Sequence, residues 1–492
     1  MRATARGIAA LAALLLARGL PAQEQAPLRW GGDAEGGAPF VEADPADPTR
    51  VRGFDVEVAE RIALGLGRKA EFVQVAWASI DSSVARGDFD IGLSGVEDAP
   101  GRRASHAVTV PYFAFREVLT VRAEDRERFR SLRDLAGRRV GTLAGTLAYE
   151  VLLRAAREHG VEPVSYDTDT HPYQDLRGGR LDAVLLDHII AARATARTDG
   201  LVTQPGTVAV GHYVGVLAQA NTALRDQIDA VLRAAMRDGS LEAIYRRWQV
   251  WDETQPRLFA DVLSGVALAG GGGAAQDLSQ ATLAYLPALL RAAGLTLLLS
   301  CLAMAMAVAL GVAIACGRVY GGAWLRVPLH AYVEVMRGTP ALLQLFVLYY
   351  GLASVVALPA FVAAVLGLAL NYAAYESEIY RGALESVPRG QLEAARVLGL
   401  REAQVLRWVR GPQAFRLALA PMTNDFVALL KDSSLVSVIT VVELTKQTSI
   451  FATNVGNWLV PGVLCAVLYL AMSLPLAHLA RRLELRLRGG HA

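Results

Sequence analysis

An uncharged apolar run sets the first limit on how this chain can fold. Between Arg291 and Arg318 the sequence reads AAGLTLLLSCLAMAMAVALGVAIACG, without an acidic or basic residue. About 20 helical residues of this kind cross the hydrocarbon core of a bilayer, so the run predicts a membrane-spanning helix. Residues 27–262 carry mixed charges instead, so we expect a soluble half followed by a membrane half.

Further apolar segments indicate an all-α membrane domain of about five transmembrane helices over residues 285–485. Basic residues gather after the first span, in the loop before the fourth span and after the fifth. Because basic loops prefer the cytoplasm, these segments are predicted to be cytoplasmic and the soluble half to lie outside. The other spans are expected near 327–352, 359–375, 417–442 and 458–480.

The N-terminus independently indicates export. Residues 1–22 combine basic residues with an apolar run, Ile8–Ala17, that is too short to span a bilayer. This pattern is typical of a secretory signal. Cleavage near Ala22 and retention as an anchor both remain open, and either would export the residues that follow.

Several chemistries are not expected. All three cysteines, Cys301, Cys316 and Cys465, lie in or beside apolar spans, which predicts neither a disulfide framework nor a cysteine-rich metal site. The sequence has no block of basic residues interleaved with aromatic residues, so a nucleic acid partner is not expected. None of the three lysines follows a phosphate-binding glycine loop. We therefore predict no catalytic residue, metal or cofactor in this chain.

A short helix is predicted in the cytoplasmic loop PRGQLEAARVLGL, Pro388–Leu400. Pro388 suits a first helical turn, and Gly399 suits a left-handed helix end. A second helix can begin at Arg401. Ala394 and Ala395 would leave one face small enough for a close partner. The residues alone leave open whether the helix is a docking element or a solvated connection.

The sequence around this loop resembles a known family. AAYESEIYRGALESVPRGQLEAARVLGLREAQ closely resembles the EAA loop of amino acid ABC importer permeases, in the branch that moves polar amino acids. Further matches are VMRGTPALLQLFVLYYGL before it and PMTNDFVALLKDSSLVSVITVVEL after it. Gly411 departs from the family, which usually has an apolar residue before the proline.

The resemblance covers nearly all of residues 285–485 and implies a type I permease fold. The EAA loop would occupy 376–412 and seat in a groove of a cytoplasmic ATPase dimer, which would supply ATP hydrolysis. The permease domain would pair as a homodimer in the lipid of a bacterial inner membrane. The implied coupling residues are Glu393, Ala394, Ala395 and Gly399.

The soluble half alternates strand-like and helix-like runs, which is the α/β pattern. The order of these runs, with the stretch GFDVEVAERIA, resembles the periplasmic polar amino acid-binding proteins over most of 27–250. That resemblance implies a bilobed α/β fold (type II) in a domain spanning 27–252, with a linker over 253–284. Lobe one would hold about 27–118 and 214–250, and lobe two about 119–213.

By the same resemblance, six residues would bind an amino acid. Arg102 would bind the ligand carboxylate and Asp187 its ammonium group, since a guanidinium forks onto a carboxylate. Backbone or hydroxyl contacts would come from Ser94, Gly95 and Thr146, and an aromatic wall from Trp77. The residues alone leave open that Arg102 is a surface arginine, Asp187 a helix-capping aspartate and Trp77 a core tryptophan.

The ligand side chain is less defined. The family often has an aromatic residue where this chain has Gly37, which would remove one wall of the pocket. Asp33, Glu35 and Glu97 favour a basic or amide side chain if they line the pocket, and they are ordinary exposed charges otherwise.

The predicted function is that of a fused substrate-binding and permease subunit of an ABC importer for a polar amino acid. Two alternatives use the same bilobed domain, a ligand-gated channel and an amino acid chemosensor. A channel would need its pore to interrupt the binding domain between the lobes and would need a filter loop, and a chemosensor would need a cytoplasmic signalling domain. Both lobes here precede every span, and only 11 residues follow Arg481.

Overall fold

The computed structural model describes residues 26–34, 39–47, 49–266, 278–353, 355–356, 358–455 and 458–488. The predicted signal, Glu35, Gly37 and the glycine-rich centre of the predicted linker lie outside these residues. The chain divides into two compact units. The first holds Met1–Glu117 and Ala209–Gly273, and the second holds Val118–Val208 and Ala274–Ala492.

The first unit is an α/β lobe on a five-stranded sheet of order β4-β1-β5-β12-β6. β1 pairs in parallel with β4 and β5, which requires crossover connections such as α2 and α3. The returning strand β12 is antiparallel to β5 and β6. The elements are β1 Leu28–Gly32, α2 Phe54–Gly65, β4 Ala70–Gln74, α3 Ile80–Arg86, β5 Ile91–Gly92, α4 Pro100–Ser105, β6 His106–Val108, β12 Val216–Ala218, α8 Thr222–Arg237 and α9 Ser240–Arg247; a short hairpin pairs β2 Glu42–Ala43 with β3 Val51–Arg52.

The second unit begins with another α/β lobe, whose sheet has the order β11-β7-β10-β8-β9. β8 is parallel to both β9 and β10. The unit boundaries fall inside the long strands β7 and β11, which connect the two lobes. The predicted bilobed α/β fold is confirmed. The elements are β7 Phe113–Arg122, β8 Arg139–Leu143, α5 Leu147–His159, β9 Glu162–Tyr166, α6 His171–Arg177, β10 Ala183–Asp187, α7 His188–Arg197 and β11 Leu201–Tyr213.

The first part of the predicted linker is structured. Helix α10, Thr254–Ser264, buries Leu258, Phe259 and Val262 in the first unit. The side chain of Gln255 is fully buried, and it bonds both the N–H and the C=O of Ala114. A buried amide with both partners satisfied holds this helix on lobe one. The binding domain therefore extends past residue 252.

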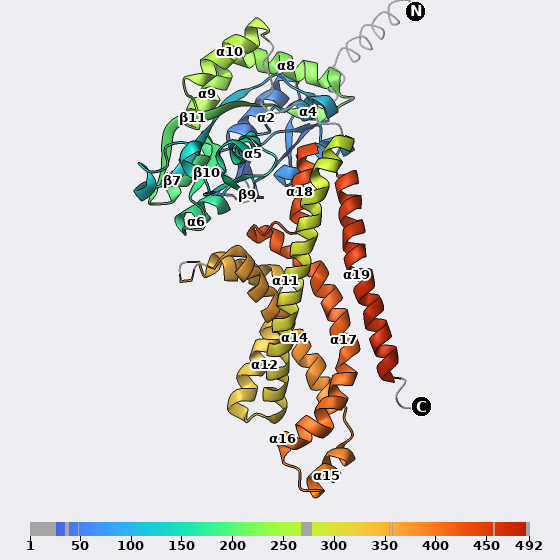
Figure 1. Cartoon of the computed structure of the whole chain (residues 1–492). Coiled ribbons are helices and arrows are strands. Elements are labelled where there is room, and N and C mark those ends of the chain that lie inside the picture. The colour runs from blue at the N-terminus through green and yellow to red at the C-terminus, as the bar shows by residue number, and fades with distance from the viewer. Residues whose placement is uncertain are drawn as a thin grey trace, which may run out of the picture. The chain divides into compact units, whose positions relative to one another are not determined.

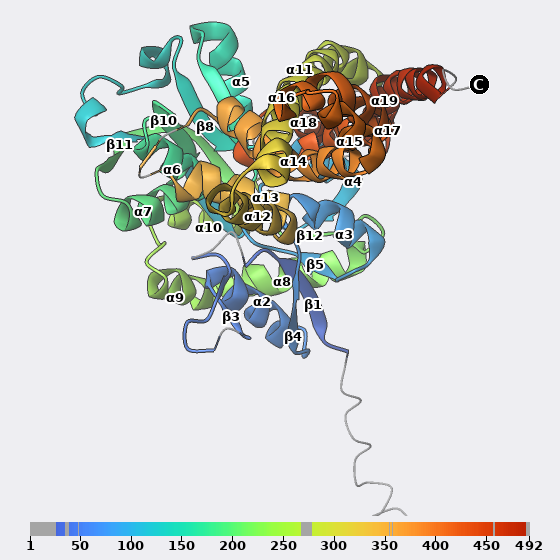
Figure 2. The same cartoon turned by 90° about the horizontal axis from the view of Figure 1, so that it is seen from below.

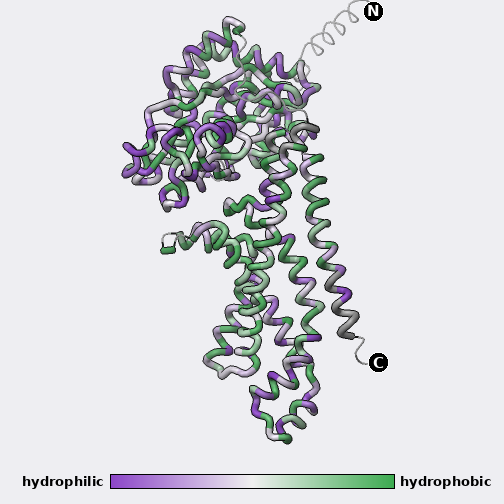
Figure 3. The backbone as a smooth tube through the Cα atoms, in the orientation of Figure 1, coloured by the Kyte–Doolittle hydropathy of each residue, from purple (hydrophilic) through white to green (hydrophobic). Residues whose placement is uncertain are grey.

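The rest of the second unit is helical, as predicted (Figure 1). Among the described residues, three helices have the length and composition to cross a membrane: α11, α14 and α19. Figure 3 shows their hydrophobic character along most of their length. The elements are α11 Leu278–Tyr320, α12 Ala323–Gly338, α13 Ala341–Phe346, α14 Ala360–Glu385, α15 Arg389–Val397, α16 Glu402–Gln404, α17 Gly411–Asp432, α18 Leu444–Val455 and α19 Leu459–Arg488.

The second and fourth predicted spans differ from continuous apolar helices. Thr339 and Pro340 are both extended, so the second span is broken between α12 and α13. Proline lacks an N–H and disfavours a helical residue before it. In the fourth, α17 ends at Asp432, and a 3₁₀ segment, Ser433–Ile439, leads towards α18.

Helix α14 is the centre of the helical half. It packs on α11, α12, α13 and α17, and Figure 2 shows α19 at the edge of the group. The α11–α14 contact buries small residues, which allow two helix backbones to approach closely. They include Ala303, Ala307, Ala369 and Ala373.

Candidate ligand-binding and coupling sites

The lobe-one candidates Ser94 and Gly95 form a left-handed turn after β5. Their φ angles are 89° and 65°, and a positive φ is uncommon for a residue with a side chain. Asp55, in the first turn of α2, holds this turn. Its Oδ2 accepts the Gly95 N–H at 2.8 Å, and its Oδ1 accepts the Tyr112 hydroxyl at 2.9 Å. The Gly95 N–H is thus bonded within the lobe.

The structure brings Trp77 and Ser94 together. The Trp77 indole Nε1–H donates to the Ser94 carbonyl at 3.1 Å, and the Trp77 backbone N–H donates to Asp33 Oδ2 at 2.8 Å. Gln74 Nε2 donates to the other oxygen of Asp33 at 3.1 Å. Asp33, proposed above as a pocket charge, therefore positions Trp77. Trp77 also packs against the hydrophobic core beside Ile80.

Arg102 on α4 is held by an acid of its own lobe. Its Nε–H lies 3.0 Å from both carboxylate oxygens of Asp81, and its Nη1 donates to the Glu97 carbonyl. The side chain is 14% exposed. A guanidinium carries five N–H donors, so these bonds leave donors for a ligand. The neighbouring Arg103 instead forks onto Asp98, at 2.6 Å to each oxygen.

The lobe-two candidates Thr146 and Asp187 cap helices. Thr146 Oγ1 accepts the Tyr149 N–H at 3.3 Å and donates to the Leu143 carbonyl at 2.8 Å. Asp187 Oδ1 accepts the N–H groups of Ile189 and Ile190 at 2.8 and 2.9 Å. The capping role that the sequence left open for Asp187 is therefore present.

Both caps lie at the carboxyl ends of neighbouring parallel strands, β8 and β10. In open α/β sheets this edge is where ligands bind. The adjacent helix α7 also carries Arg193, which pairs with the buried Asp169. The two candidates of lobe two thus share one edge of its sheet, beside a buried ion pair.

Asp55, which holds the turn at Ser94 and Gly95, was not singled out from the sequence. It lies in the stretch GFDVEVAERIA, where an aspartate between apolar residues at the start of a helix was the available signal. The side chain is fully buried. Burial raises the pKa of Asp55 to about 7, while the hydrogen bonds from Tyr112 and Gly95 lower it.

This shift predicts a pH-dependent stability. Between about pH 4 and pH 7 the folded lobe holds the Asp55 proton more tightly than the unfolded chain does. The free energy of unfolding should therefore fall as pH rises through this window, by on the order of 4 kcal/mol at most, and then level off. In Asp55→Asn this slope should be absent. Thermal unfolding of both full chains from pH 5 to pH 8 checks this, and equal slopes would contradict it.

The loop expected to couple to an ATPase has a small core of its own. Leu392 and Ala395 on α15 are buried with Val387 and Val405. Glu393 and Ala394 are exposed, whereas Ala395, predicted with them, faces this core. The predicted left-handed helix end is confirmed, because Gly399 has a φ of 80°.

Two exposed apolar side chains at the end of α15 were not singled out from the sequence. Val397 is 88% exposed and Leu398 is 81% exposed. The periodicity of EAARVLGL was the signal, since Leu392 and Ala395 share one helix face and Val397 falls outside it. We call Val397 and Leu398 the α15 apolar pair. Figure 1 shows α15 and α16 together at one end of the helical half.

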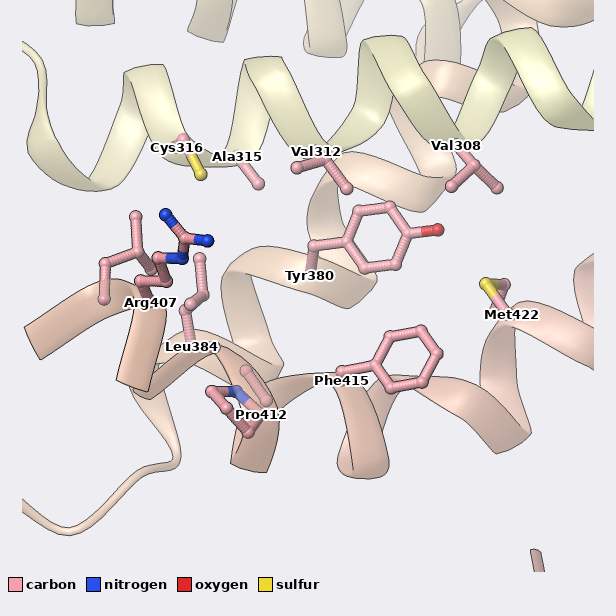
Figure 4. Close-up of a pocket in the computed structure, with 13 residues that line it drawn as sticks. Val308, Val312, Ala315, Cys316, Tyr380, Leu384, Arg407, Pro412, Phe415 and Met422 are labelled. Carbon is pink, nitrogen blue, oxygen red and sulfur yellow. The ribbon is translucent and has the colours of Figure 1, made fainter. Parts of the chain in front are cut away.

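A groove of about 480 Å³ lies among α11, α14 and α17, and its lining is almost entirely apolar. Tyr380 and Phe415 project between the helices, and Val308 and Val312 face them (Figure 4). A polar zwitterion would lose its hydration there without matching hydrogen bonds. This groove is therefore unsuited to an amino acid.

The chain combines a bilobed α/β domain with the apolar helices and exposed short helix that follow it. This combination defines a membrane protein that carries its own ligand-binding domain. Residues 29–250 match the bacterial extracellular solute-binding proteins, family 3. Residues 307–489 match the binding-protein-dependent transport system inner membrane components. The chain belongs to the amino-acid ABC transporter permeases, with a family 3 solute-binding domain fused ahead of the permease domain.

Two permease relatives agree with this assignment. The probable amino-acid ABC transporter permease protein YckA of Bacillus subtilis (strain 168) is 38% identical over 187 residues, covering 38% of this chain and 83% of YckA. The glutamine transport system permease protein GlnP of Escherichia coli (strain K12) is 36% identical over 208 residues, covering 41% of this chain and 94% of GlnP. A solved ancestral arginine-binding protein bound to arginine is 26% identical, with a TM-score of 0.43, covering 46% of this chain and 99% of that structure.

Proposed function

We propose that this chain is the substrate-binding and permease subunit of an importer for a polar amino acid, driven by a separate cytoplasmic ATPase. The observation that carries the proposal is the order of the two matched regions, solute binding at 29–250 and transport at 307–489, in one chain. The basic loops favour a binding domain on the outer face of the inner membrane and a cytoplasmic EAA loop.

We further propose that each lobe supplies part of the ligand site. On lobe one, Arg102 would bind the carboxylate with the donors that Asp81 leaves open, and Trp77 would contact the ligand side chain. On lobe two, Asp187 would bind the ammonium group while it caps α7. Ser94, Gly95 and Thr146 would act mainly by holding their turns, because the Gly95 N–H and the Thr146 hydroxyl proton are already bonded.

The ligand class is proposed as polar amino acids and not as one compound. The permease relatives are named for glutamine, L-cystine and octopine, which differ widely in side chain. Asp33 was a reason to favour a basic ligand, but both of its oxygens accept bonds within lobe one. The preference for a ligand with a basic or amide side chain is therefore weaker.

Coupling to the ATPase is proposed for α15. The helix presents Glu393 and Ala394 to solvent, and the α15 apolar pair adds two side chains that would be buried by a partner. Large apolar side chains that stand clear of the surface mark contact sites. Gly399 ends the helix at a left-handed residue, so the chain turns away and leaves the pair at the tip.

A ligand screen tests the proposed function. The full chain in detergent and a fragment of residues 26–266, which retains α10, would be heated with each of the twenty amino acids and with L-cystine and octopine. A ligand at 100 times its Kd should stabilise the domain by about 2.7 kcal/mol, a readily visible shift. At least one polar amino acid should raise the unfolding temperature of both samples. If none does, the importer proposal fails.

A further inference from the structure

The segment Asp167–Arg180 of lobe two contacts the helical half inside the second compact unit. Its centre is Asp175, which is 1% exposed. Asp175 Oδ2 accepts the hydroxyl of Tyr166, in lobe two, at 2.6 Å and the hydroxyl of Tyr349, in the permease domain, at 2.7 Å. One buried carboxylate is therefore shared by the two domains.

Arg180 strengthens the same contact. Its Nη1 lies 2.8 Å from Asp175 Oδ1, and its Nη2 donates to the Tyr349 carbonyl at 3.0 Å. The guanidinium also lies 4.1 Å from the centroid of the Tyr349 ring, a cation–π distance. Both members of a buried ion pair thus bind Tyr349, which is itself 1% exposed.

Two further contacts flank Tyr349. The His171 ring on α6 stacks on Tyr350, with centroids 4.0 Å apart and planes 17° apart. Lys446 on α18 is 2% exposed and forms an ion pair with Asp167. Tyr349 and Tyr350 belong to a π-helical turn, Val347–Gly351, a form often found at functional sites. Figure 2 shows α6 beside α13, which this turn continues.

These contacts bury charged side chains, which need partners. A buried lysine or arginine is tolerated only when a partner offsets the loss of hydration, and removal of one partner leaves the other charge unpaired. Lys446 and Arg180 have their partners in this arrangement. The contact therefore specifies one position of lobe two on the permease domain, unlike a loose tether.

All four lobe-two residues, Asp167, His171, Asp175 and Arg180, lie in one stretch around α6. A surface formed by a single lobe keeps its shape whether the two lobes are open or closed. A ligand shifts an equilibrium only through contacts that differ between the two states. Closure of the lobes therefore cannot by itself make or break this contact.

We propose that lobe two stays anchored to the permease domain of its own chain in both the presence and the absence of ligand, so that only lobe one moves on binding. This inference rests on the proposed function, because it assigns a fixed and a moving lobe to the importer. Lobe two would then remain attached to the permease domain and would not diffuse on a flexible linker.

A distance measurement tests the anchoring. Spin labels would be placed at Glu158→Cys on lobe two and at Leu283→Cys on α11, both exposed, after Cys301, Cys316 and Cys465 are replaced by serine. The full chain would be studied in lipid nanodiscs, without amino acids and with a mixture of all twenty. We expect one narrow distance distribution that is the same in both samples. A broad distribution that narrows only with amino acids would overturn the proposal.

Charge reversal identifies the contact. Asp167→Lys and Lys446→Asp should each remove the narrow distance component, and the double variant should restore it, because the pair is re-formed in reverse. The matched control is Glu42→Lys, a like charge reversal in the Glu42–Arg52 pair of lobe one, which should leave the distances unchanged. If both single variants keep the narrow component, Asp167 and Lys446 do not anchor the lobe.

Thermal shift on the same labelled samples separates the two proposals. If no amino acid raises the unfolding temperature, the importer proposal fails whatever the distances show. If an amino acid does so while the distribution is broad without it, the anchoring alone fails.

Discussion

Arg102→Ala should lower amino acid affinity by about 30-fold to 4,000-fold while the binding domain stays folded. The loss of one partner from a desolvated charged contact costs about 2–5 kcal/mol, and each 1.4 kcal/mol is tenfold in Kd. Arg102→Lys should lose most of the same affinity, because an ammonium group cannot fork onto a carboxylate. Calorimetry with the amino acid found in the thermal screen measures both variants.

Arg103→Ala is the matched control for Arg102. It removes the same side chain from the next position of α4 and breaks an ion pair with Asp98, which is more buried than Asp81. Its affinity should stay within about threefold of wild type. Equal losses in both variants would show that α4 as a whole supports the lobe, and would remove Arg102 from the ligand site.

On lobe two the informative substitution is Asp187→Asn and not Asp187→Ala. Alanine would also remove the cap that Asp187 Oδ1 provides to α7, at a cost of about 1 kcal/mol in stability. Asparagine keeps an oxygen for that cap and removes the negative charge. A loss of affinity in Asp187→Asn at unchanged unfolding temperature would therefore report the ammonium contact alone.

A second large effect is expected at the α15 apolar pair. Val397→Asp and Leu398→Asp, combined, should abolish assembly with the ATPase subunit and ligand-stimulated ATP hydrolysis. Burial of each large apolar side chain is worth about 1.5–3 kcal/mol, which an exposed carboxylate forfeits. Both residues are exposed, so the permease fold should survive. Co-purification of the ATPase and its hydrolysis rate in liposomes measure the effect.

Gly390→Asp is the control for this pair. It adds a carboxylate to the same helix at a position where a side chain would meet no neighbour. The position lies in the first turn of α15, where a negative charge is favourable. Assembly and hydrolysis should persist in this variant. If the double variant assembles normally, the loop only connects α14 with α17. The proposed coupling would then be wrong.

The sequence alone determined those features that depend on neighbouring residues. The uncharged run after Arg291 predicted α11, because hydrophobicity accumulates along one segment. Gly399 predicted a left-handed helix end, because only a residue without a β-carbon adopts that conformation at little cost. The alternation of strands and helices likewise predicted an α/β domain before the spans, since periodicity is a local property.

Only the tertiary structure decided which side chains meet. Asp55 is 57 residues from Tyr112, and Asp175 is 174 residues from Tyr349. No local pattern identifies the distant hydroxyl group that each of these acids binds. Arg102 and Arg103 are neighbours of identical type, yet one binds Asp81 and the other Asp98. The partner of a buried charge is set by long-range packing, because the surroundings that exclude water come from distant segments.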